Sequence, residues 1–372
     1  MTRVVTRPGP AAAPGGADEY ADEYVDEYAD EYVELRRHGL RYACRVVGGT
    51  VAGRDGPTAD TATTEPLLLL GGALQDMYSW PRLERRIASR TRLVLIDLPG
   101  TGTADDLPAE QGFDVLAQAA VHALDHLGLR RVNLLGASYG APIAYRIAQR
   151  HPERVARLLL AGAAHRVNDP MAALMRDTVQ HLESASAHPG DSPAGPGDSS
   201  AGPGDSPADL WPGPGDYADR LADCLVNRDE QHRVRQSAAV RRLLTRQCLR
   251  ITRREALRNA ACHRRLLDGE LLPPGGIRGV TTLVFTGEHD HTTTARQNRD
   301  VAATIADSTL LFLREADHMA HLERDTEYAE LVLRFLHDLP LDGLPYCTPP
   351  EHPAPGPGTG PAPVPATRCP AA

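Results

Sequence analysis

A serine between two glycines is the first candidate for chemistry, in the stretch GASYG at residues 136–140. The stretch directly follows the apolar run VNLL and directly precedes the helical pattern APIAYRIAQR. A strand that turns sharply into a helix strains the backbone at the serine and crowds its neighbours, so the flanking positions must be glycine and the hydroxyl projects above the sheet. This context favours Ser138 as a nucleophile that attacks a carbonyl carbon, with a plain turn serine as the alternative.

A serine hydroxyl is a poor nucleophile near neutral pH, so it needs a neutral imidazole to accept its proton and a carboxylate to orient that imidazole. Two later segments offer such groups. TGEHD follows the apolar run TTLVF and contains Glu288, His289 and Asp290, while READHM follows LLFL and contains His318. The order serine, acid, histidine is the one that this serine turn predicts. His289 and His321 are the alternative bases.

Short apolar runs and amphipathic helical patterns alternate along the chain, which is typical of a mostly parallel sheet covered by helices on both faces. The segment from 163 to about 273 breaks this alternation, because it carries helical and low-complexity patterns and no run typical of a strand. An insertion after the strand expected at 155–160, which is the sixth in the numbering of the family named below, is the simplest account. The fold class is therefore α/β, with strands expected at residues 40–47, 67–70, 93–96, 132–135, 155–160, 282–285 and 310–313.

Taken together, these motifs resemble those of the α/β-hydrolase superfamily, over roughly residues 33–345 apart from the insertion. DLPGTG at residues 97–102 is similar to the turn after the family's fourth strand, with a plain turn as the alternative. The resemblance implies an α/β-hydrolase fold, in which helices flank a twisted, mostly parallel sheet and a helical cap follows the sixth strand. It also implies the serine-nucleophile, capped branch that is similar to esterases and thioesterases.

The same resemblance separates the candidate acids and bases. TGEHD is similar to the family's acid loop, in which the last residue is the acid, so Asp290 is favoured over Glu288. DHMAHLE is similar to the loop in which the catalytic histidine precedes a glutamate, here Glu323. The implied catalytic set is Ser138, Asp290 and His318.

An oxyanion formed during acyl transfer needs hydrogen-bond donors, and the serine turn supplies the backbone N–H of Tyr139. The resemblance implies a second donor in the loop LGGALQ after the third strand. This loop is similar to the family's His-Gly-x segment, with Gly71 where histidine is common, and the second donor is then the N–H of Ala73. The candidates for the substrate pocket are Gln75, Met77 and Trp80, with packing of the following helix as the alternative for Trp80.

Three segments are too rich in a few residue types to pack in a core. Residues 1–33 form an acidic arm that repeats ADEY or VDEY and is expected to be disordered, with docking to a partner as the alternative. Residues 188–216 carry GPGDS-type repeats, and residues 346–372 form a Pro-rich tail that is also expected to be disordered. The ordered parts are then an α/β-hydrolase core at 34–164 and 273–345, and a helical cap at 165–272 that contains the low-complexity tract.

Composition narrows the classes of function. The net charge of −9 is concentrated in the acidic arm, and no basic face with interleaved aromatics indicates nucleic-acid binding. All 40 basic residues are arginine, which excludes Schiff-base catalysis by lysine. Six cysteines without CxxC pairs, and no leader or long apolar run, favour a cytoplasmic protein away from the membrane. Neither a metal nor a cofactor is expected, because a serine, histidine and acid set needs none.

The expected cap is rich in arginine. One interpretation is a solvated helix face without a specific function, in a chain that uses arginine in place of lysine. The alternative hypothesis is a docking surface for an anionic partner, such as an acyl carrier protein or an acyl group linked to coenzyme A. The arginines in question are Arg233, Arg235, Arg241, Arg242, Arg246, Arg250, Arg253 and Arg254.

The sequence thus predicts a hydrolase that cleaves a carboxylic ester or thioester through an acyl-serine intermediate, in a biosynthetic, secondary-metabolite setting. A cyclase, acyltransferase or lyase would use the same residues, as would a cofactor-free enzyme similar to haloperoxidases. A non-catalytic ligand-binding protein is the least favoured alternative. A serine at the turn argues against relatives that cleave halides or epoxides with an aspartate nucleophile.

Overall fold

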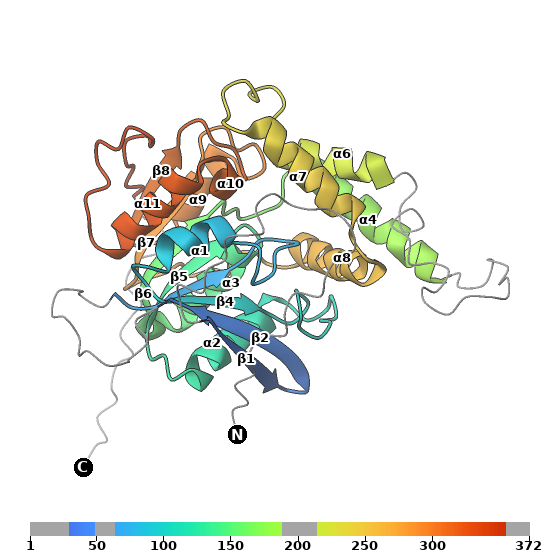
Figure 1. The fold of residues 1–372 in the computed structure, drawn as a ribbon, viewed down its shortest axis with the longest axis horizontal. Helices are drawn as coiled ribbons and strands as arrows, with labels where there is room; N and C mark the ends of the chain where they lie inside the picture. The colour runs from blue at the N-terminus through green and yellow to red at the C-terminus, as the bar shows by residue number, and fades with distance from the viewer. Residues whose placement is uncertain (1–29, 49–63, 188–213, 355–372) are drawn as a thin grey trace, which may run out of the picture.

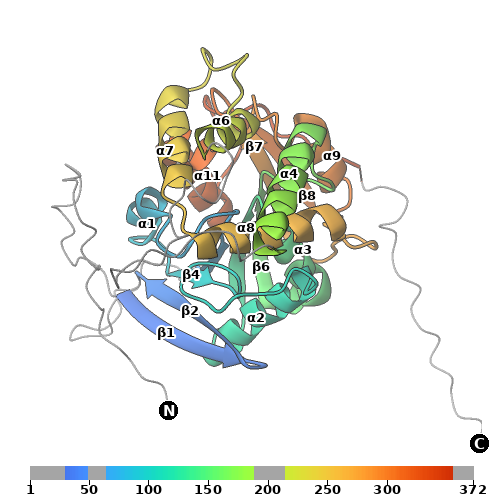
Figure 2. The ribbon, with the colours of Figure 1, turned by 90° about the vertical axis from the view of Figure 1, so that its right-hand side faces the viewer.

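The computed structural model describes residues 30–48, 64–187 and 214–354. Most of the acidic arm, most of the low-complexity tract and the end of the Pro-rich tail lie outside the described residues, so their disorder stays a prediction. The described residues form a sheet with helices on both of its faces and a further group of helices to one side (Figures 1 and 2).

A single sheet of eight strands forms the centre of the described structure. Its strands are β1 (Asp30–Arg37), β2 (Leu40–Val47), β3 (Leu67–Leu70), β4 (Leu93–Asp97), β5 (Val132–Ala137), β6 (Val155–Ala161), β7 (Thr281–Gly287) and β8 (Ser308–Leu313). They lie in the order β1-β2-β4-β3-β5-β6-β7-β8, with the first two pairings antiparallel and the others parallel. Every strand expected from the sequence is present, which confirms the α/β class and the mostly parallel sheet.

Apolar side chains cover both faces of the sheet, because successive residues of a strand point to opposite sides. In β4, for example, Val94 and Ile96 join one buried cluster while Leu93 and Leu95 join the other. The first cluster packs under α2 (Phe113–His126), α3 (Gly140–Arg150) and α9 (Ala295–Ala302). The second packs under α1 (Pro81–Ile87), α10 (Ala320–Glu323) and α11 (Asp325–Leu336). Because both faces are buried, the sequences of the central strands are continuous apolar runs.

The predicted boundary of the acidic arm at residue 33 is wrong, because β1 begins at Asp30. β1 forms a hairpin with β2, and His38 and Gly39 at its turn both have positive φ, as a two-residue hairpin turn requires. Val33 and Leu35 alternate into the core, and the carboxylate of Asp30 pairs with Arg45. Burial on one face and this ion pair hold the end of the repeat in a strand.

The insertion between β6 and β7 holds helices throughout its described residues and no strand, and none of the described helices is both long and apolar enough to cross a membrane. Its helices are α4 (Asp169–Ala187), α6 (Pro214–Leu225), α7 (Ser237–Leu249) and α8 (Arg253–Asp268). They share an apolar cluster of their own, which includes Leu174, Tyr217 and Leu221. Both views show these helices gathered on one side of the sheet (Figures 1 and 2).

The predicted boundary of the Pro-rich tail at residue 346 is also wrong. Tyr346 and Cys347 are buried in the cluster under α11, and residues 347 and 351 form isolated bridges with β8. The carboxylate of Glu351 pairs with Arg299, with Nε and Oε2 2.7 Å apart. The chain therefore stays on the outer edge of the sheet up to residue 354, because that edge offers unpaired backbone groups and apolar surface.

The ion pair that fixes β2 to α1 gives a test of the fold. The side chains of Arg45 and Glu84 are 6% and 7% exposed, with Nη2 and Oε1 3.1 Å apart. Arg45→Met should lower the free energy of unfolding by about 3–5 kcal/mol, because it leaves the Glu84 carboxylate buried without its cation. The double variant Arg45→Met/Glu84→Leu should recover most of the loss in urea unfolding. A single variant as stable as wild type would show that the pair is not buried as described.

Candidate active site

Three parallel strands bring the predicted catalytic residues to one edge of the sheet. Ser138 follows β5, Asp290 lies just after β7, and His318 lies just after β8. The carboxyl ends of parallel strands point the same way, so loops that are far apart in the sequence meet there.

Ser138 lies in the sharp turn between β5 and α3. Its φ is +48°, in the left-handed region that strains a residue with a side chain. A Cβ on Gly136 would lie 2.6 Å from the Cβ of Ala144, and one on Gly140 would lie 2.2 Å from the carbonyl oxygen of Leu70. Both flanking positions must therefore be glycine, as the sequence predicts for a turn that projects the serine hydroxyl above the sheet.

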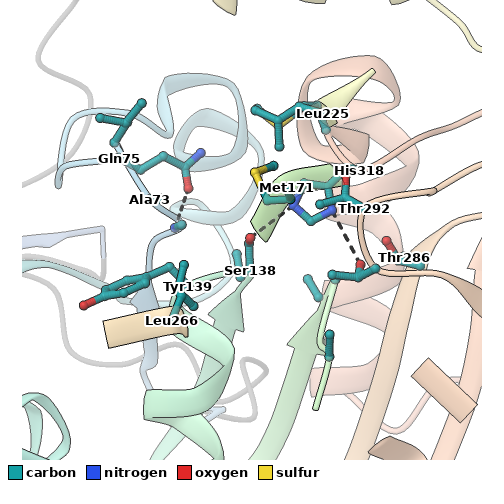
Figure 3. Close-up of a pocket in the computed structure, with 18 of the residues that line it drawn as sticks. Ala73, Gln75, Ser138, Tyr139, Met171, Leu225, Leu266, Thr286, Thr292 and His318 are labelled. Carbon is teal, nitrogen blue, oxygen red and sulfur yellow. Dashed lines mark hydrogen bonds between the residues drawn. The ribbon is translucent and has the colours of Figure 1, made fainter. Parts of the chain in front are cut away.

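The hydroxyl of Ser138 and the carboxylate of Asp290 lie on opposite sides of the His318 ring. Nε2 is 3.1 Å from Oγ of Ser138, and Nδ1 is 2.9 Å from Oδ2 of Asp290 (Figure 3 shows the first contact). With the ring neutral, Nδ1–H donates to the carboxylate and Nε2 accepts from the serine hydroxyl. The structure thus brings together the three residues predicted as nucleophile, base and acid.

Asp290 is held by more hydrogen bonds than the one to His318. The backbone N–H groups of Thr292 and Thr293 both donate to Oδ1 at 2.8 Å, and the hydroxyls of Thr286 and Thr293 donate to Oδ2. Burial favours the neutral acid, but His318 and these hydroxyl donors outweigh it and lower the pKa of Asp290 below its ordinary value. The residue is therefore a fixed negative charge beside the imidazole.

The negative charge of Asp290 stabilises the protonated form of His318. Burial disfavours the imidazolium, but the charge of Asp290 and the hydrogen bond to it outweigh burial and raise the pKa of His318 above its ordinary value. A proton taken from Ser138 is therefore stabilised on the ring.

The alternative acid and bases lie elsewhere. Glu288 accepts a hydrogen bond from the backbone N–H of Glu315 at 2.8 Å and lies 3.3 Å from His289. Nε2 of His321 lies 3.1 Å from Nε2 of Gln75, and its ring packs at a tilt against Trp80, with ring centroids 4.6 Å apart. Burial lowers the pKa of His321 to about 3, with His318 adding to the effect. None of them contacts Ser138 in the way that His318 does.

A buried glutamate fixes the histidine loop. Oε2 of Glu323 accepts from the backbone N–H of Asp317 at 2.6 Å, and Oδ1 of Asp317 accepts from the N–H of His318 at 2.8 Å. Burial raises the pKa of Glu323 to about 8, which favours its neutral form. The predicted glutamate of this loop thus acts on the backbone that carries the base.

The loop that carries Ala73 lies over Ser138. A Cβ on Gly72 would be 3.5 Å from the Cβ of Ser138, and Ala73 and Tyr139 both line the cavity beside the serine. Oε1 of Gln75 accepts from the N–H of Gly72 at 2.6 Å and so fixes the loop across its turn. Ala73 and Tyr139 thus lie beside Ser138, their role as oxyanion donors stays a prediction, and Gln75 holds the residue next to Ala73 in place.

Asp97 anchors the other end of this loop. Its buried carboxylate accepts from the backbone N–H groups of Met77 and Thr103, each at 2.7 Å. Gly102 has φ +45°, and a Cβ there would lie 2.1 Å from Oδ2 of Asp97. The DLPGTG turn is thus more than a plain turn, since it joins the end of β4 to the loop over the serine.

A cavity of about 200 Å³ opens above Ser138, between the sheet edge and the inserted helices. An apolar cavity of roughly 150 Å³ can hold a benzene ring, so the space suits a small acyl group or ring. Gln75 lines it as predicted, but Met77 and Trp80 do not and instead lie in the core under α1. Their backbone turns inward after Gln75, which places both side chains behind the loop. The apolar wall includes Met171, Met175, Leu221, Leu225, Leu243, Leu244, Leu266 and Leu271.

Sequence reasoning missed several residues of the site. Thr286 and Thr293 orient Asp290, and Asn259 and His263 of α8 line the cavity. The threonines could have been suspected, because they lie four residues before and three residues after the acid. The two α8 residues are four positions apart on one helical face, but nothing in the sequence says which face meets the cavity.

Half of the arginines that were predicted to form a docking surface make ion pairs with carboxylates of the described chain. Arg233, Arg235, Arg241 and Arg254 each form an ion pair with a carboxylate. An anionic carrier or coenzyme as partner stays a prediction.

Comparisons with known proteins agree with the fold. A family profile described as the alpha/beta hydrolase fold matches residues 65–184, a stretch that contains Ser138 but ends before Asp290 and His318. An α/β-hydrolase enzyme from a Medee basin deep-sea metagenome library covers 83% of this chain and 98% of its own, with TM-score 0.62 and 15% identity. The enol-lactonase from Burkholderia xenovorans covers 82% and 99%, with TM-score 0.60 and 20% identity.

Among curated proteins the similarity is local. A 2-hydroxymuconate semialdehyde hydrolase from a Pseudomonas species is 33% identical over 28% of this chain and 38% of its own length. Epoxide hydrolase 4 from Mus musculus is 35% identical over 27% of this chain and 28% of its own. The chain thus matches less than half the length of these relatives.

The raised pKa of His318 predicts the pH dependence of any reaction in which its ring accepts the proton of Ser138. Only the neutral imidazole can accept the serine proton, so kcat/KM should fall as the pH drops, with a midpoint above about 6.5, the ordinary pKa of histidine. Asp290→Asn should move this midpoint to lower pH and reduce kcat about 10⁴-fold. Glu288→Gln, on the same loop, is the control and should keep the wild-type midpoint. An unmoved midpoint in Asp290→Asn would show that Asp290 does not act on the base.

The bond between Gln75 and Gly72 predicts an effect on turnover rather than on binding. Gln75→Leu frees the loop, and misplaced oxyanion donors should lower kcat about 10–100-fold with little change in KM. Ser79→Ala, at another lining position, should leave kcat near the wild-type value. A rise in KM at constant kcat in Gln75→Leu would instead mean that Gln75 binds the ground state directly.

Proposed function

We propose that the chain is a member of the α/β-hydrolase superfamily and that it hydrolyses a small carboxylic ester or thioester through an acyl-serine intermediate. The observation that carries the proposal is the pair of contacts at the His318 ring, 3.1 Å to the hydroxyl of Ser138 and 2.9 Å to the carboxylate of Asp290. These are the distances that a base needs in order to accept the serine proton while its tautomer is held.

In the first half of the reaction, Oγ of Ser138 attacks the carbonyl carbon and its proton moves to Nε2 of His318. The carbonyl oxygen becomes an oxyanion, which the N–H groups of Tyr139 and Ala73 would stabilise. As the tetrahedral intermediate collapses, the bond to the leaving oxygen or sulfur breaks, and the leaving group takes the proton from His318. The acyl group remains on Ser138.

In the second half, His318 takes a proton from a water molecule that attacks the acyl carbon. A second tetrahedral intermediate forms and collapses, Oγ of Ser138 leaves and is reprotonated by His318, and the carboxylic acid departs. Asp290 stays ionised throughout and stabilises the imidazolium. The protein, the substrate and one water molecule account for every bond and proton in these steps.

The inserted helices act in this proposal as a cap that selects the acyl group. Their apolar side chains form the wall of the cavity opposite the sheet edge. An apolar wall favours acyl groups by the area that they bury, which is roughly 25 cal/mol per Å².

Hydrolysis of a carbon–carbon bond is a second candidate. It is favoured by the curated relatives, one of which is named a 2-hydroxy-6-oxononadienedioate/2-hydroxy-6-oxononatrienedioate hydrolase and is 34% identical over 28% of this chain. The same base and nucleophile could serve it. Product analysis with simple esters and with that dienedioate separates the two candidates. Hydrolysis of an ester yields an acid and an alcohol, whereas hydrolysis of a carbon–carbon bond in the dienedioate yields two carbon fragments.

Labelling with a fluorophosphonate tests the proposed nucleophile. Wild type should gain the mass of a single adduct, because His318 activates one hydroxyl in the cavity. Ser138→Ala should gain none, and Ser79→Ala, which removes another hydroxyl from the cavity lining, should label like wild type. Intact mass spectrometry of the folded proteins gives the readout. Equal labelling of wild type and Ser138→Ala, or no labelling of wild type, would contradict an acyl-serine mechanism.

A further inference from the structure

Two buried polar side chains interrupt the apolar wall that the insertion gives to the cavity. Asn259 and His263 lie one turn apart on α8, and both line the cavity. Each residue is 3% exposed. Side chains four positions apart on a helix are neighbours, so the two polar groups can act on one ligand group.

The amide of Asn259 has one partner too few. Its Nδ2 donates to the hydroxyl of Tyr217 at 3.2 Å, while Oδ1 is buried and accepts no hydrogen bond from the described residues. A buried carbonyl oxygen without a donor is costly, and the great majority of such atoms in native proteins are paired. Asn259 lines the cavity, and its acceptor therefore lacks a donor within the described structure.

The ring of His263 makes no hydrogen bond with the described residues, and its Nδ1 is fully buried. Burial lowers the pKa of His263 to about 4, so the ring is neutral at physiological pH. A neutral imidazole offers one N–H donor and one nitrogen acceptor. Neither atom is used in a hydrogen bond within the described residues, and His263 lines the cavity.

The side chains of Asn259 and His263 are both uncharged and suit a neutral ligand group, whereas the cation Arg166, which also lines the cavity, is 65% exposed and pairs with Asp169. None of the described lining residues is aspartate or glutamate, so a buried cation would lack a counter-charge. A carboxylate could not donate to Oδ1 of Asn259 and would meet an uncharged imidazole. A ketone could accept from His263 but would leave Oδ1 of Asn259 unpaired. A hydroxyl can donate to Asn259 and accept from His263 at the same time.

We propose that Asn259 and His263 form a specificity site for a hydroxyl group on the acyl chain of the substrate, which rests on the proposed ester hydrolysis. The acyl carbonyl lies at Ser138, the chain follows the apolar wall, and the hydroxyl reaches α8. The substrate class is therefore a hydroxylated small acyl ester or thioester.

The test compares methyl hexanoate with methyl hydroxyhexanoates that carry the hydroxyl at successive carbon atoms. Wild type should prefer one hydroxyl position over methyl hexanoate by about tenfold or more in kcat/KM. Asn259→Leu and His263→Leu should each bring that ratio close to one while methyl hexanoate is still hydrolysed. Met175→Leu, an apolar exchange on the same wall, is the matched control and should keep the ratio. A wild-type ratio near one at every position, or an unchanged ratio in both leucine variants, would overturn the proposal.

The melting temperature of His263→Leu distinguishes a role of His263 in recognising the substrate from a role in folding. The ring of His263 has no hydrogen bond to lose, so the melting temperature of His263→Leu should equal or exceed that of wild type. A large fall in melting temperature together with an unchanged hydroxyl preference would assign the residue to folding instead.

Binding of the esters to Ser138→Ala, which lacks the nucleophile, tests the hydroxyl site independently of the proposed reaction. Calorimetry should give a dissociation constant for the preferred hydroxy ester about tenfold below that for methyl hexanoate, and His263→Leu in the same background should abolish the difference. If wild type neither labels nor hydrolyses any ester but this difference remains, the proposed reaction fails and the hydroxyl site stands. If methyl hexanoate is hydrolysed and the difference is absent, only the hydroxyl site fails.

Discussion

A carboxylate buried without exposed surface is the group around which the site is built. The side chain of Asp290 is 0% exposed, and a buried charge is tolerated only where it is paired and hydrogen-bonded. The loop after β7 meets this demand by turning two backbone N–H groups and two threonine hydroxyls towards the acid. The last partner, His318, must come from β8, so the register of β7 against β8 decides whether the charge is stable. The same bond aims the imidazole at Ser138, and stability and geometry therefore depend on one contact.

The inserted helices are hydrogen-bonded to the loops that carry the acid and the base. After α6, the backbone N–H of Asn227 donates to the carboxylate of Asp317, and its side chain donates to the carbonyl of His289 at 2.9 Å. From α8, the buried guanidinium of Arg265 lies 2.6 Å from the hydroxyl of Tyr139, the residue after the nucleophile. The insertion is thus joined to all three catalytic segments, and a movement of these helices would be felt at His318 as well as at the cavity wall.

The sequence predicted the elements whose signals are local. Strands buried on both faces appear as apolar runs, and glycines on both sides of Ser138 mark a turn that no other residue allows. The sequence failed where tertiary contacts decide. The repeat DEYVEL appears as a charged arm, yet Val33 and Leu35 alternate into the core once β2 is beside them. Met77 and Trp80 follow the oxyanion loop directly, but Asp97 accepts from the backbone of Met77 and turns that segment away from the cavity. No local pattern contains this bond, since the carboxylate and the N–H belong to different strand ends.

The cavity wall limits how the protein can choose its substrate. An apolar pocket separates chains that differ by one methylene by only about 10–200-fold, and it rejects an added hydroxyl weakly. A pocket with unpaired polar atoms behaves differently, because every ligand that leaves them unpaired forgoes the stabilisation that a matching ligand gains. Oδ1 of Asn259 and the ring of His263 have no hydrogen-bond partner within the described residues, so the cost of removing them from water is already included in the folding free energy. In the proposed hydroxyl site, a matching ligand gains these hydrogen bonds at α8, and selectivity then depends on the distance between its hydroxyl and the carbonyl at Ser138 more than on the bulk of the chain between them.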